Sequence, residues 1–177
     1  GSGFKKCSLG LKTPVKMIVN LLLLVSGAVL FALSNPGFLF TGGIGFFAWF
    51  AYIPVFILVR RSSWKTVWLN GGLYGLLSYA LYGSWLPAFS VQAATASFSM
   101  YFVFMALVFT AMKAAFVLCG KYGGIAAAFV FCAFEYLKTL GFTGFSYGVS
   151  AYTQWKNSSV AGMCAVTGVW RLSALII

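Results

Sequence analysis

Six apolar stretches of roughly membrane-spanning length follow one another along this chain of 177 residues, with only short breaks between them. A helix of about 20 apolar residues crosses the hydrocarbon core of a bilayer, where an open backbone finds no water to bond. Hydrophobic residues make up 62% of the chain and charged residues 7%, against roughly 25% charged in a soluble domain. The sequence therefore predicts an all-α, polytopic membrane domain over residues 17–177, behind a basic leader at residues 1–16. The predicted spans are residues 17–34, 38–59, 66–86, 98–119, 122–140 and 159–177.

Proline and glycine mark several of the breaks. Residues 35–37 (Asn-Pro-Gly) end the first stretch, because the residue before a proline is forced out of the helical region. Pro54 lies inside the second stretch and predicts a kink there. Gly71 and Gly75 in the third have the four-residue spacing that lets two helices approach closely. Residues 141–158 are too polar and too rich in glycine to span, so we expect an outer interfacial loop or a re-entrant hairpin.

Basic residues between the stretches indicate the orientation of the spans. If the spans alternate in direction, every basic group before residue 122 falls on one side, and the breaks near residues 35–37 and 90–97 on the other side carry no charge. This positive-inside pattern predicts a cytoplasmic N-terminus, and it explains the net charge of +11 without nucleic acid as a partner. It places Lys138 and residues 141–158 on the outer side. The basic residues concerned are Lys5, Lys6, Lys12, Lys16, Arg60, Arg61, Lys65, Lys113 and Lys121.

The first stretch, with its basic leader, also resembles a signal peptide that ends at residues 32–34 (Ala-Leu-Ser). Its apolar core is long for a signal peptide, and further spans follow at once. These features favour an uncleaved first span.

Several kinds of chemistry are excluded by residue type. Histidine is absent, which removes the most common general base and the most common metal ligand. The four cysteines have no CxxC or other metal-ligand spacing, and are interpreted as apolar thiols. The sequence therefore predicts neither a metal site nor a cofactor. The cysteines are Cys7, Cys119, Cys132 and Cys164.

Glu135 is the only acidic residue of the chain, and it lies within an apolar stretch. An ionisable group inside a membrane costs several kcal/mol unless it is paired, so such a residue indicates a function by default. Lys138 follows three residues later, on the same helical face, and is the predicted partner. Two interpretations remain open, an ion pair that anchors the fifth span and a polar pocket beneath residues 141–158. Because a buried pair adds little net stability over apolar side chains, the pocket is slightly favoured.

Aromatic residues crowd the outer loop, and Trp85 ends the third span. An ordinary belt of aromatic residues at the membrane interface is one interpretation. A pocket for a long apolar ligand is the other, because Gly144 and Gly148 permit close approach, and Thr153 and Gln154 supply hydrogen bonds. The candidate lipid-pocket residues are Glu135, Lys138, Phe145, Tyr147, Tyr152, Gln154 and Trp85.

Three segments of the sequence carry a resemblance to a known family. Residues 135–138 (Glu-Tyr-Leu-Lys), 143–147 (Thr-Gly-Phe-Ser-Tyr) and 151–154 (Ala-Tyr-Thr-Gln) resemble the apolipoprotein N-acyltransferase pattern. That pattern reads Glu-(Trp/Phe)-Leu-Arg, Thr-Gly-Phe-Pro-Trp and Gly-Tyr-Ser-Gln at the same spacing. Weaker matches extend the resemblance over nearly the whole chain, but only over the N-terminal membrane part of the family. Lys138 and Arg171 depart from it, standing where the family has arginine and a small residue.

The resemblance implies a multi-pass enzyme of the bacterial inner membrane that acts in lipoprotein biosynthesis. The family transfers an acyl chain from a phospholipid donor to the α-amino group of diacylglyceryl-cysteine in a lipoprotein acceptor. Its catalytic cysteine, glutamate and lysine belong to a nitrilase-like domain that follows the membrane spans, so no catalytic residue is expected in this chain. Glu135, Lys138 and the outer loop are then expected to form a lipid-accessible floor beneath that domain.

The two ends of the chain, and the lone acid, leave further interpretations. The chain lacks an initiator methionine, and its last apolar run reaches Ile177 with Arg171 inside it, which predicts a piece of a longer protein or a truncated copy. Such a copy is expected to be inactive alone, or to have only a structural role. A small transporter or channel subunit, with Glu135 as an intramembrane ion site, is the alternative. A second intramembrane acid would favour that alternative, and the sequence has none.

Overall fold

The computed structural model describes residues 13–37, 41–140, 144 and 146–177. Within these ranges every regular element is a helix and no strand is present, so the predicted all-α class is confirmed. Short 3-10 turns connect several of the helices. The elements are α1 (Thr13–Ser34), η1 (Gly45–Phe47), α2 (Ala48–Arg61), α3 (Val67–Tyr82), η2 (Leu86–Ala88), α4 (Val91–Leu118), η3 (Gly120–Tyr122), α5 (Gly123–Leu137), η4 (Ser150–Gln154), α6 (Ser158–Thr167) and α7 (Val169–Ile176).

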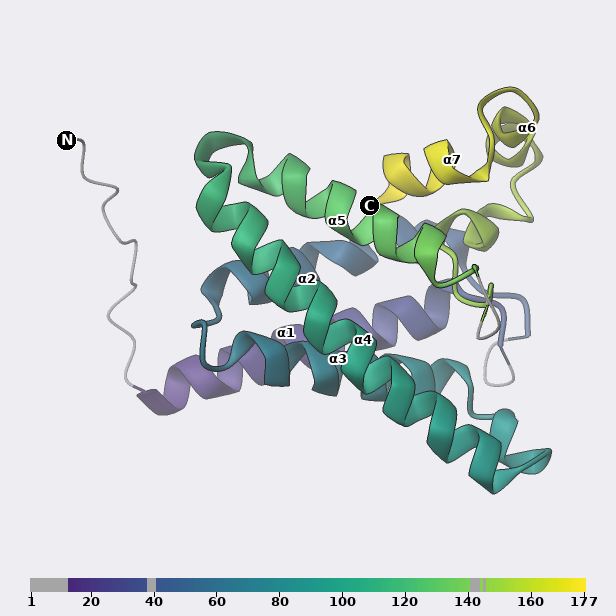
Figure 1. The fold of residues 1–177 in the computed structure, drawn as a ribbon. Coiled ribbons are helices and arrows are strands. Elements are labelled where there is room, and N and C mark those ends of the chain that lie inside the picture. Colours follow the sequence, from purple (N-terminus) through teal and green to yellow (C-terminus); the bar gives the residue numbers. More distant parts are fainter. Residues whose placement is uncertain (1–12, 38–40, 141–143, 145) are drawn as a thin grey trace.

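Helices α1 to α5 run back and forth between two ends of the molecule, with α4 crossing the others obliquely (Figure 1). Helix α1 packs against α2 and α3, α3 packs against α4, and α4 packs against α5. The connections after α2 and α4 lie at the end where α1 begins. The connections after α1, α3 and α5 lie at the opposite end, together with η4 and α6 (Figure 1). We call this opposite end the loop end.

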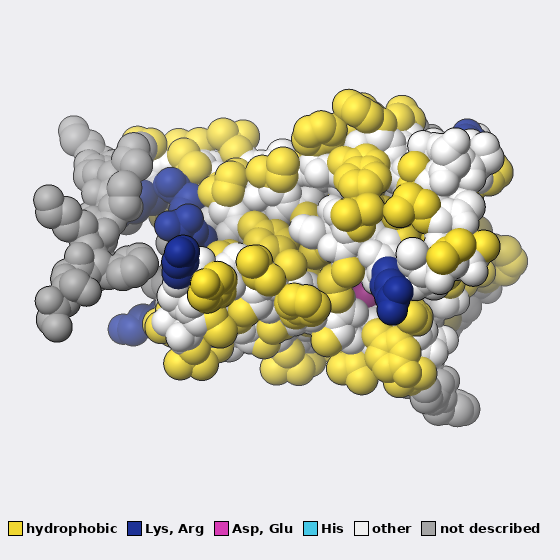
Figure 2. Space-filling model, turned by 90° about the horizontal axis from the view of Figure 1, so that it is seen from above, with side chains coloured by type: hydrophobic (Ala, Val, Ile, Leu, Met, Phe, Trp, Pro, Cys, Tyr) yellow, Lys and Arg dark blue, Asp and Glu magenta, His cyan; other side chains and the backbone are white. Residues whose placement is uncertain are grey.

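Basic side chains gather at the end where α1 begins, which we call the basic end. Figure 2 shows Lys and Arg side chains clustered there, with apolar side chains covering much of the surface toward the loop end. Lys113, near the end of α4, donates from its Nζ to the carbonyl oxygen of Arg60, 2.9 Å away. The alternation of connections therefore brings basic groups from distant parts of the sequence to one end, as the positive-inside pattern requires.

Among the described residues, two helices are long and apolar enough to cross a membrane by themselves, Val15–Ser34 and Val91–Leu118. Helices α2, α3 and α5 are shorter, with 14, 16 and 15 residues. Helix α2 begins well after residue 38, its predicted start, because the chain first turns through Gly43 at a φ of +54°. Ile44 N–H then donates to the Leu33 carbonyl at 2.9 Å, which ties this turn back to α1.

The helices at residues 90–97 and 159–177 also differ from the sequence prediction. Helix α4 already begins at Val91, because the Ser90 side chain accepts a hydrogen bond from Ala93 N–H at 3.3 Å and caps the helix. Residues 159–177, predicted as one span, form two short helices instead. Gly168 separates α6 from α7 with a φ of +79°, a conformation that glycine adopts readily and that ends a helix.

Helices α3 and α4 contact each other through their backbones. A Cβ atom added at Gly71 would overlap the Met105 carbonyl oxygen, and one added at Gly75 would overlap the Tyr101 carbonyl oxygen. The ring of Tyr101 stacks on that of Tyr79, with centroids 3.4 Å apart and planes at 10°. The four-residue glycine spacing in the sequence thus lies at a real helix contact, and it fixes Tyr79 at the loop end.

Replacing Gly75 with alanine is expected to lower the free energy of unfolding by about 2–3 kcal/mol, because α4 must move away from α3. Gly162→Ala in α6 is the matched control, since an added Cβ there meets nothing within 4 Å. It should raise the stability slightly, by up to about 1 kcal/mol, through helix propensity. Denaturant unfolding of the purified protein in micelles measures both changes. Equal effects of the two substitutions would contradict a close contact at Gly75.

Candidate functional site

Glu135 lies at the loop end, in the last turns of α5, and only 1% of its surface is exposed. Its Oε1 accepts hydrogen bonds from the Ser150 backbone N–H at 3.0 Å and from the Ser150 hydroxyl at 2.5 Å. The Tyr52 hydroxyl donates to the same oxygen at 3.5 Å and contacts the Ser150 hydroxyl. Glu135 therefore holds Ser150, the first residue of η4, and Tyr52 of α2 contacts both residues.

The other carboxylate oxygen of Glu135, Oε2, is buried, and within the described part of the chain it has no hydrogen-bond partner. The Tyr74 hydroxyl is also buried, and it too has no hydrogen-bond partner among the described residues. A buried polar atom left unbonded costs about 1–3 kcal/mol. The polar network around Glu135 is thus satisfied on one side only.

Lys138 follows α5 as its C-cap residue and is 7% exposed. Its Nζ donates to the Tyr79 hydroxyl at 3.0 Å, to the Gly148 carbonyl at 2.9 Å and to the Tyr147 carbonyl at 3.2 Å. These three bonds use all the protons of an ammonium group. The Nζ also lies 5.7 Å from the centres of the Tyr79 and Phe134 rings, a favourable cation–π distance. The positive charge is therefore fully solvated by the protein.

The direct pair predicted between Glu135 and Lys138 is not formed. Glu135 bonds to Ser150 and Tyr52, while the Lys138 ammonium is taken up by a phenol and two carbonyls. Sequence spacing places the two residues on one helical face, but it cannot include acceptors that arrive from other segments. Both side chains instead hold residues 147–150. Glu135 accepts a hydrogen bond from the Ser150 backbone N–H, and Lys138 donates to the Tyr147 and Gly148 carbonyls.

The turn at Gly148 requires glycine. Its φ is +69°, and an added Cβ would lie 3.0 Å from Phe31 Cζ and 3.5 Å from the Tyr79 hydroxyl. This conformation turns the Tyr147 and Gly148 carbonyls to the same ammonium group. A side chain at residue 148 would be strained and would also press against α1.

The far end of η4 is tied to the rest of the loop end. Gln154 Nε2 donates to the Gly45 carbonyl at 2.8 Å and to Thr153 Oγ1 at 3.0 Å. A Cβ at Gly45 would lie 2.5 Å from the Thr153 carbonyl, so η1 and η4 touch through their backbones. Ala151 N–H donates to the Ser173 hydroxyl of α7 at 3.3 Å. Helix η4 is therefore held from four sides, by α2, α5, α7 and η1.

Most of the predicted site residues come together at the loop end. Besides Glu135, Lys138 and Gln154, the Trp85 ring lies 6.0 Å from that of Tyr147, whose carbonyl oxygen bonds to Lys138. Tyr152 is 44% exposed and lies on the outside of η4. Phe145 lies outside the described residues.

Five residues that form these hydrogen bonds are not among the site residues predicted from the sequence. Two of them are tyrosines inside apolar spans, and a phenol in such a position signals a buried hydrogen-bond partner. The serines and the glycine carry no comparable signal, since small residues of this kind are common both in interfacial loops and within membrane spans. The five are Tyr52, Tyr79, Ser150, Ser173 and Gly45.

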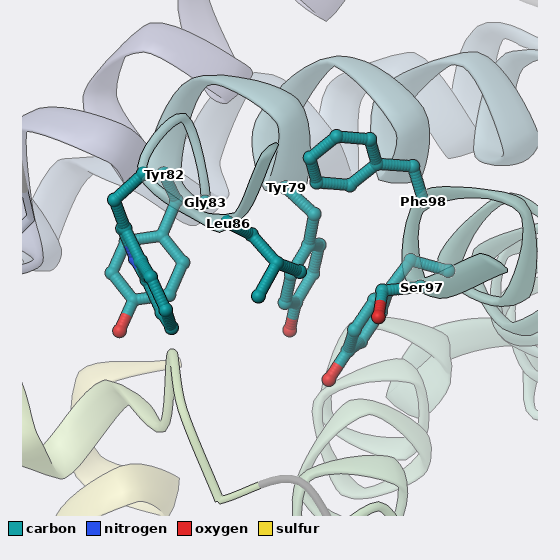
Figure 3. A pocket seen from close by; sticks show the side chains of 8 residues that line it. Tyr79, Tyr82, Gly83, Leu86, Ser97 and Phe98 are labelled. Carbon is teal, nitrogen blue, oxygen red and sulfur yellow. The ribbon is translucent and has the colours of Figure 1, made fainter. Parts of the chain in front are cut away.

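Trp85 borders a small cavity between the end of α3, η2 and the start of α4. Figure 3 shows Tyr79, Leu86 and Phe98 closing around it. Its volume is about 10 Å³, which is room for no more than one water molecule. A ligand pocket at Trp85 is therefore not formed in this structure.

A much larger groove of about 450 Å³ runs between α4 and α5. Its volume falls in the usual range of small-molecule sites, roughly 300–1,000 Å³. Apart from Lys138 at its loop end, the side chains that line it are apolar. They are Phe104, Leu107, Val108, Ala111, Val130, Ala133, Phe134 and Leu137. The groove therefore suits a long apolar ligand, and within the described residues no cluster of potential metal ligands is present.

Comparison with known proteins identifies the family. The model of the apolipoprotein N-acyltransferase N-terminal domain matches residues 18–177. The chain belongs to this family. It is 39% identical over 159 residues to apolipoprotein N-acyltransferase 1 of Treponema denticola, covering 90% of this chain and 29% of the relative. The corresponding Treponema pallidum protein is 37% identical over 156 residues, covering 88% of this chain and 29% of the relative.

A more distant apolipoprotein N-acyltransferase, from Geobacter metallireducens, is 28% identical over 166 residues, covering 88% of this chain and 31% of the relative. The chain thus spans about 29–31% of the length of these curated relatives. No solved structure matches it. Membership of this N-acyltransferase family confirms the resemblance drawn from residues 135–154, and it gives no support to a transporter or channel subunit.

Proposed function

We propose that this chain forms the membrane domain of an apolipoprotein N-acyltransferase of the bacterial inner membrane. The family match over residues 18–177 carries the proposal. The enzyme would move an acyl chain from a phospholipid to the α-amino group of a diacylated lipoprotein. The chemical step is assigned to the nitrilase-like domain that follows the membrane spans in this family, and none of the described residues is assigned to it.

In the membrane, α1 to α5 cross the bilayer with the basic end in the cytoplasm, and α6 and α7 lie at the outer interface. Exposed apolar side chains between the two ends support this arrangement, because a soluble protein rarely exposes so much contiguous apolar surface. Leu22 of α1, Leu107 of α4 and Phe129 of α5 are 63%, 64% and 67% exposed. Figure 2 displays such side chains over the face between the ends. The sixth apolar segment, residues 159–177, then lies at the outer interface as the two short helices α6 and α7.

The loop end acts as the floor on which the acyl donor is presented. Glu135 and Lys138 hold residues 147–154 in place directly above the end of the α4–α5 groove. One acyl chain of the donor lies in this groove, whose apolar lining replaces the lipid neighbours that the chain has in the bilayer. The ester would then lie near the loop, at the level of the outer interface.

A chimera tests this function. Residues 18–177 of this chain replace the matching residues of the Treponema denticola relative, and N-acylation of a lipoprotein is measured in cells depleted of their own enzyme. Acylation within about tenfold of the parent is expected, since the two membrane segments share 39% of their residues over 159 positions. A chimera that inserts to the parental level and acylates nothing would contradict the proposal.

A further inference from the structure

A second pocket, with polar lining, lies at the loop end where η1 and the start of α2 face the junction of η4 and α6. Its volume is about 400 Å³. Phe46 and Trp49 form one wall, while Gln154, Lys156, Asn157 and Ser158 form the other. It is separate from the α4–α5 groove, with which it shares no lining residue.

Lys156 gives this pocket an uncompensated positive charge. Its side chain is exposed, and its Nζ lies 5.2 Å from the centre of the Trp155 ring. The ammonium rests against Gly42, where an added Cβ would overlap it. The only acidic residue of the chain, Glu135, is buried beneath η4 and bonded to Ser150. An anion in the pocket would therefore meet no competing carboxylate.

The polar wall supplies hydrogen-bond donors beside this charge. Asn157 Oδ1 accepts from Val160 N–H at 3.3 Å, which leaves the Asn157 amide N–H groups as donors. The Ser158 hydroxyl is exposed at the same wall. Gln154 is committed to the Gly45 carbonyl and so fixes the wall. A lysine with amide and hydroxyl donors is a set that suits a phosphate group.

An apolar stripe leads away from the pocket along α2. After Phe46 of η1, Phe50, Ile53 and Ile57 of α2 follow at intervals of four, three and four residues, which places the three α2 residues on one helical face. These four side chains are 66%, 44%, 53% and 43% exposed. The stripe runs from the loop end toward the basic end, along the direction that an acyl chain takes in a bilayer.

From this combination we propose that the pocket binds the phosphate headgroup of an anionic membrane phospholipid, with an acyl chain along the α2 stripe. Lys156 supplies the charge, Asn157 and Ser158 supply hydrogen bonds, and Phe46 and Trp49 enclose the glycerol region at the interface. The site shares no lining residue with the α4–α5 groove, so lipid binding here can be tested without the acyl-transfer reaction.

Lipid retention by the purified protein in neutral detergent tests the site, with native mass spectrometry as the readout. The probes are phosphatidylglycerol, a diacylglycerol with the same chains, and sn-glycerol 3-phosphate. Lys156→Gln is expected to weaken phosphatidylglycerol binding about tenfold, the loss of one charge-assisted contact to phosphate. Lys156→Arg should retain binding. Phe50→Ser should weaken it as well, by removing contact with the chain.

Arg171→Gln is the matched control, since Arg171 is another exposed cation outside the pocket and its loss should change binding less than twofold. Because Lys156 is exposed, the glutamine variant should keep the wild-type circular dichroism and unfolding midpoint. Equal losses of phosphatidylglycerol binding in the Lys156→Gln and Arg171→Gln variants would overturn specific binding in the pocket and indicate general electrostatic attraction instead. Diacylglycerol bound as tightly as phosphatidylglycerol would overturn phosphate recognition, and glycerol phosphate bound as tightly would overturn the acyl-chain stripe.

Discussion

Replacing Glu135 with alanine is expected to lower the free energy of unfolding by about 2–4 kcal/mol, among the largest effects of any single substitution in this protein. The substitution leaves the Ser150 N–H and the Ser150 hydroxyl without their acceptor, while the Tyr52 hydroxyl keeps only its contact with Ser150. Ser150 is 1% exposed and Tyr52 is 4% exposed, so water does not replace the carboxylate easily. Reversible denaturation in mixed micelles, followed by circular dichroism, gives the change.

Leu137→Ala is the matched control for Glu135→Ala. Leu137 lies in the same turn of α5 but is 62% exposed, so its truncation should cost about 0.5 kcal/mol or less. Glu135→Gln keeps an acceptor for Ser150 and places its amide where Oε2 now lacks a partner, so a smaller loss of about 1–2 kcal/mol is expected. A Glu135→Ala variant as stable as Leu137→Ala would remove the proposed role of the carboxylate.

A double-mutant cycle with Ser150→Ala separates the two contacts that Ser150 makes to Glu135. The alanine at residue 150 keeps the backbone N–H and loses only the hydroxyl, which lies 2.5 Å from Oε1. A coupling of about 1.5–3 kcal/mol is expected for a hydroxyl bonded to a charged group. The remainder of the Glu135→Ala effect then belongs to the backbone N–H and Tyr52.

The sequence predicts the parts of this fold that depend on local chemistry. Apolar length and the break at residues 35–37 predict the bounds of α1 to within a few residues. The bounds predicted for α3 and α5 from apolar length also lie within a few residues of the helix ends. The basic residues predict that the ends of the molecule differ. The break within residues 159–177 was missed, because a glycine in an apolar run is compatible with a helix until its φ is known, and Gly168 adopts +79°.

The site was predicted as a group of residues but not as a set of contacts. Glu135 stood out because it is the only acid, and spacing along one helix offered Lys138 as its partner. The actual partners, Ser150 and Tyr52, are 15 and 83 residues away in sequence. Two of the acceptors for Lys138 are backbone carbonyls, which any residue type supplies, so no sequence pattern could reveal them.

Replacing Lys138 with methionine is expected to lower the free energy of unfolding by about 2–4 kcal/mol and to loosen residues 146–154 in particular. The change keeps the apolar stem of the side chain but removes the three hydrogen bonds that Lys138 donates to the Tyr147 and Gly148 carbonyls and to the Tyr79 hydroxyl. Amide exchange of residues 146–154 should rise at least about tenfold, equivalent to a local loss of about 1.4 kcal/mol. At the α3–α4 contact, amides that exchange through local fluctuations rather than global unfolding should change less.

Two variants control the Lys138 experiment. Lys121→Met removes the same charge from an exposed position after α4, and it should leave stability and exchange unaltered. Lys138→Arg retains a cation with more donors and matches the arginine of the family pattern, so it should recover stability to within about 1 kcal/mol. Unchanged exchange in residues 146–154 of Lys138→Met would contradict the role of the ammonium.

The Glu135 and Lys138 substitutions should not add. Each residue holds residues 147–150 by a separate contact, so once this segment is released by one substitution, the other contact is already weakened. The double variant Glu135→Ala/Lys138→Met is therefore expected to lose less than the sum of the single losses, with a coupling of about 0.5–3 kcal/mol. Strict additivity would mean that the two charges stabilise independent parts of the fold rather than one shared segment.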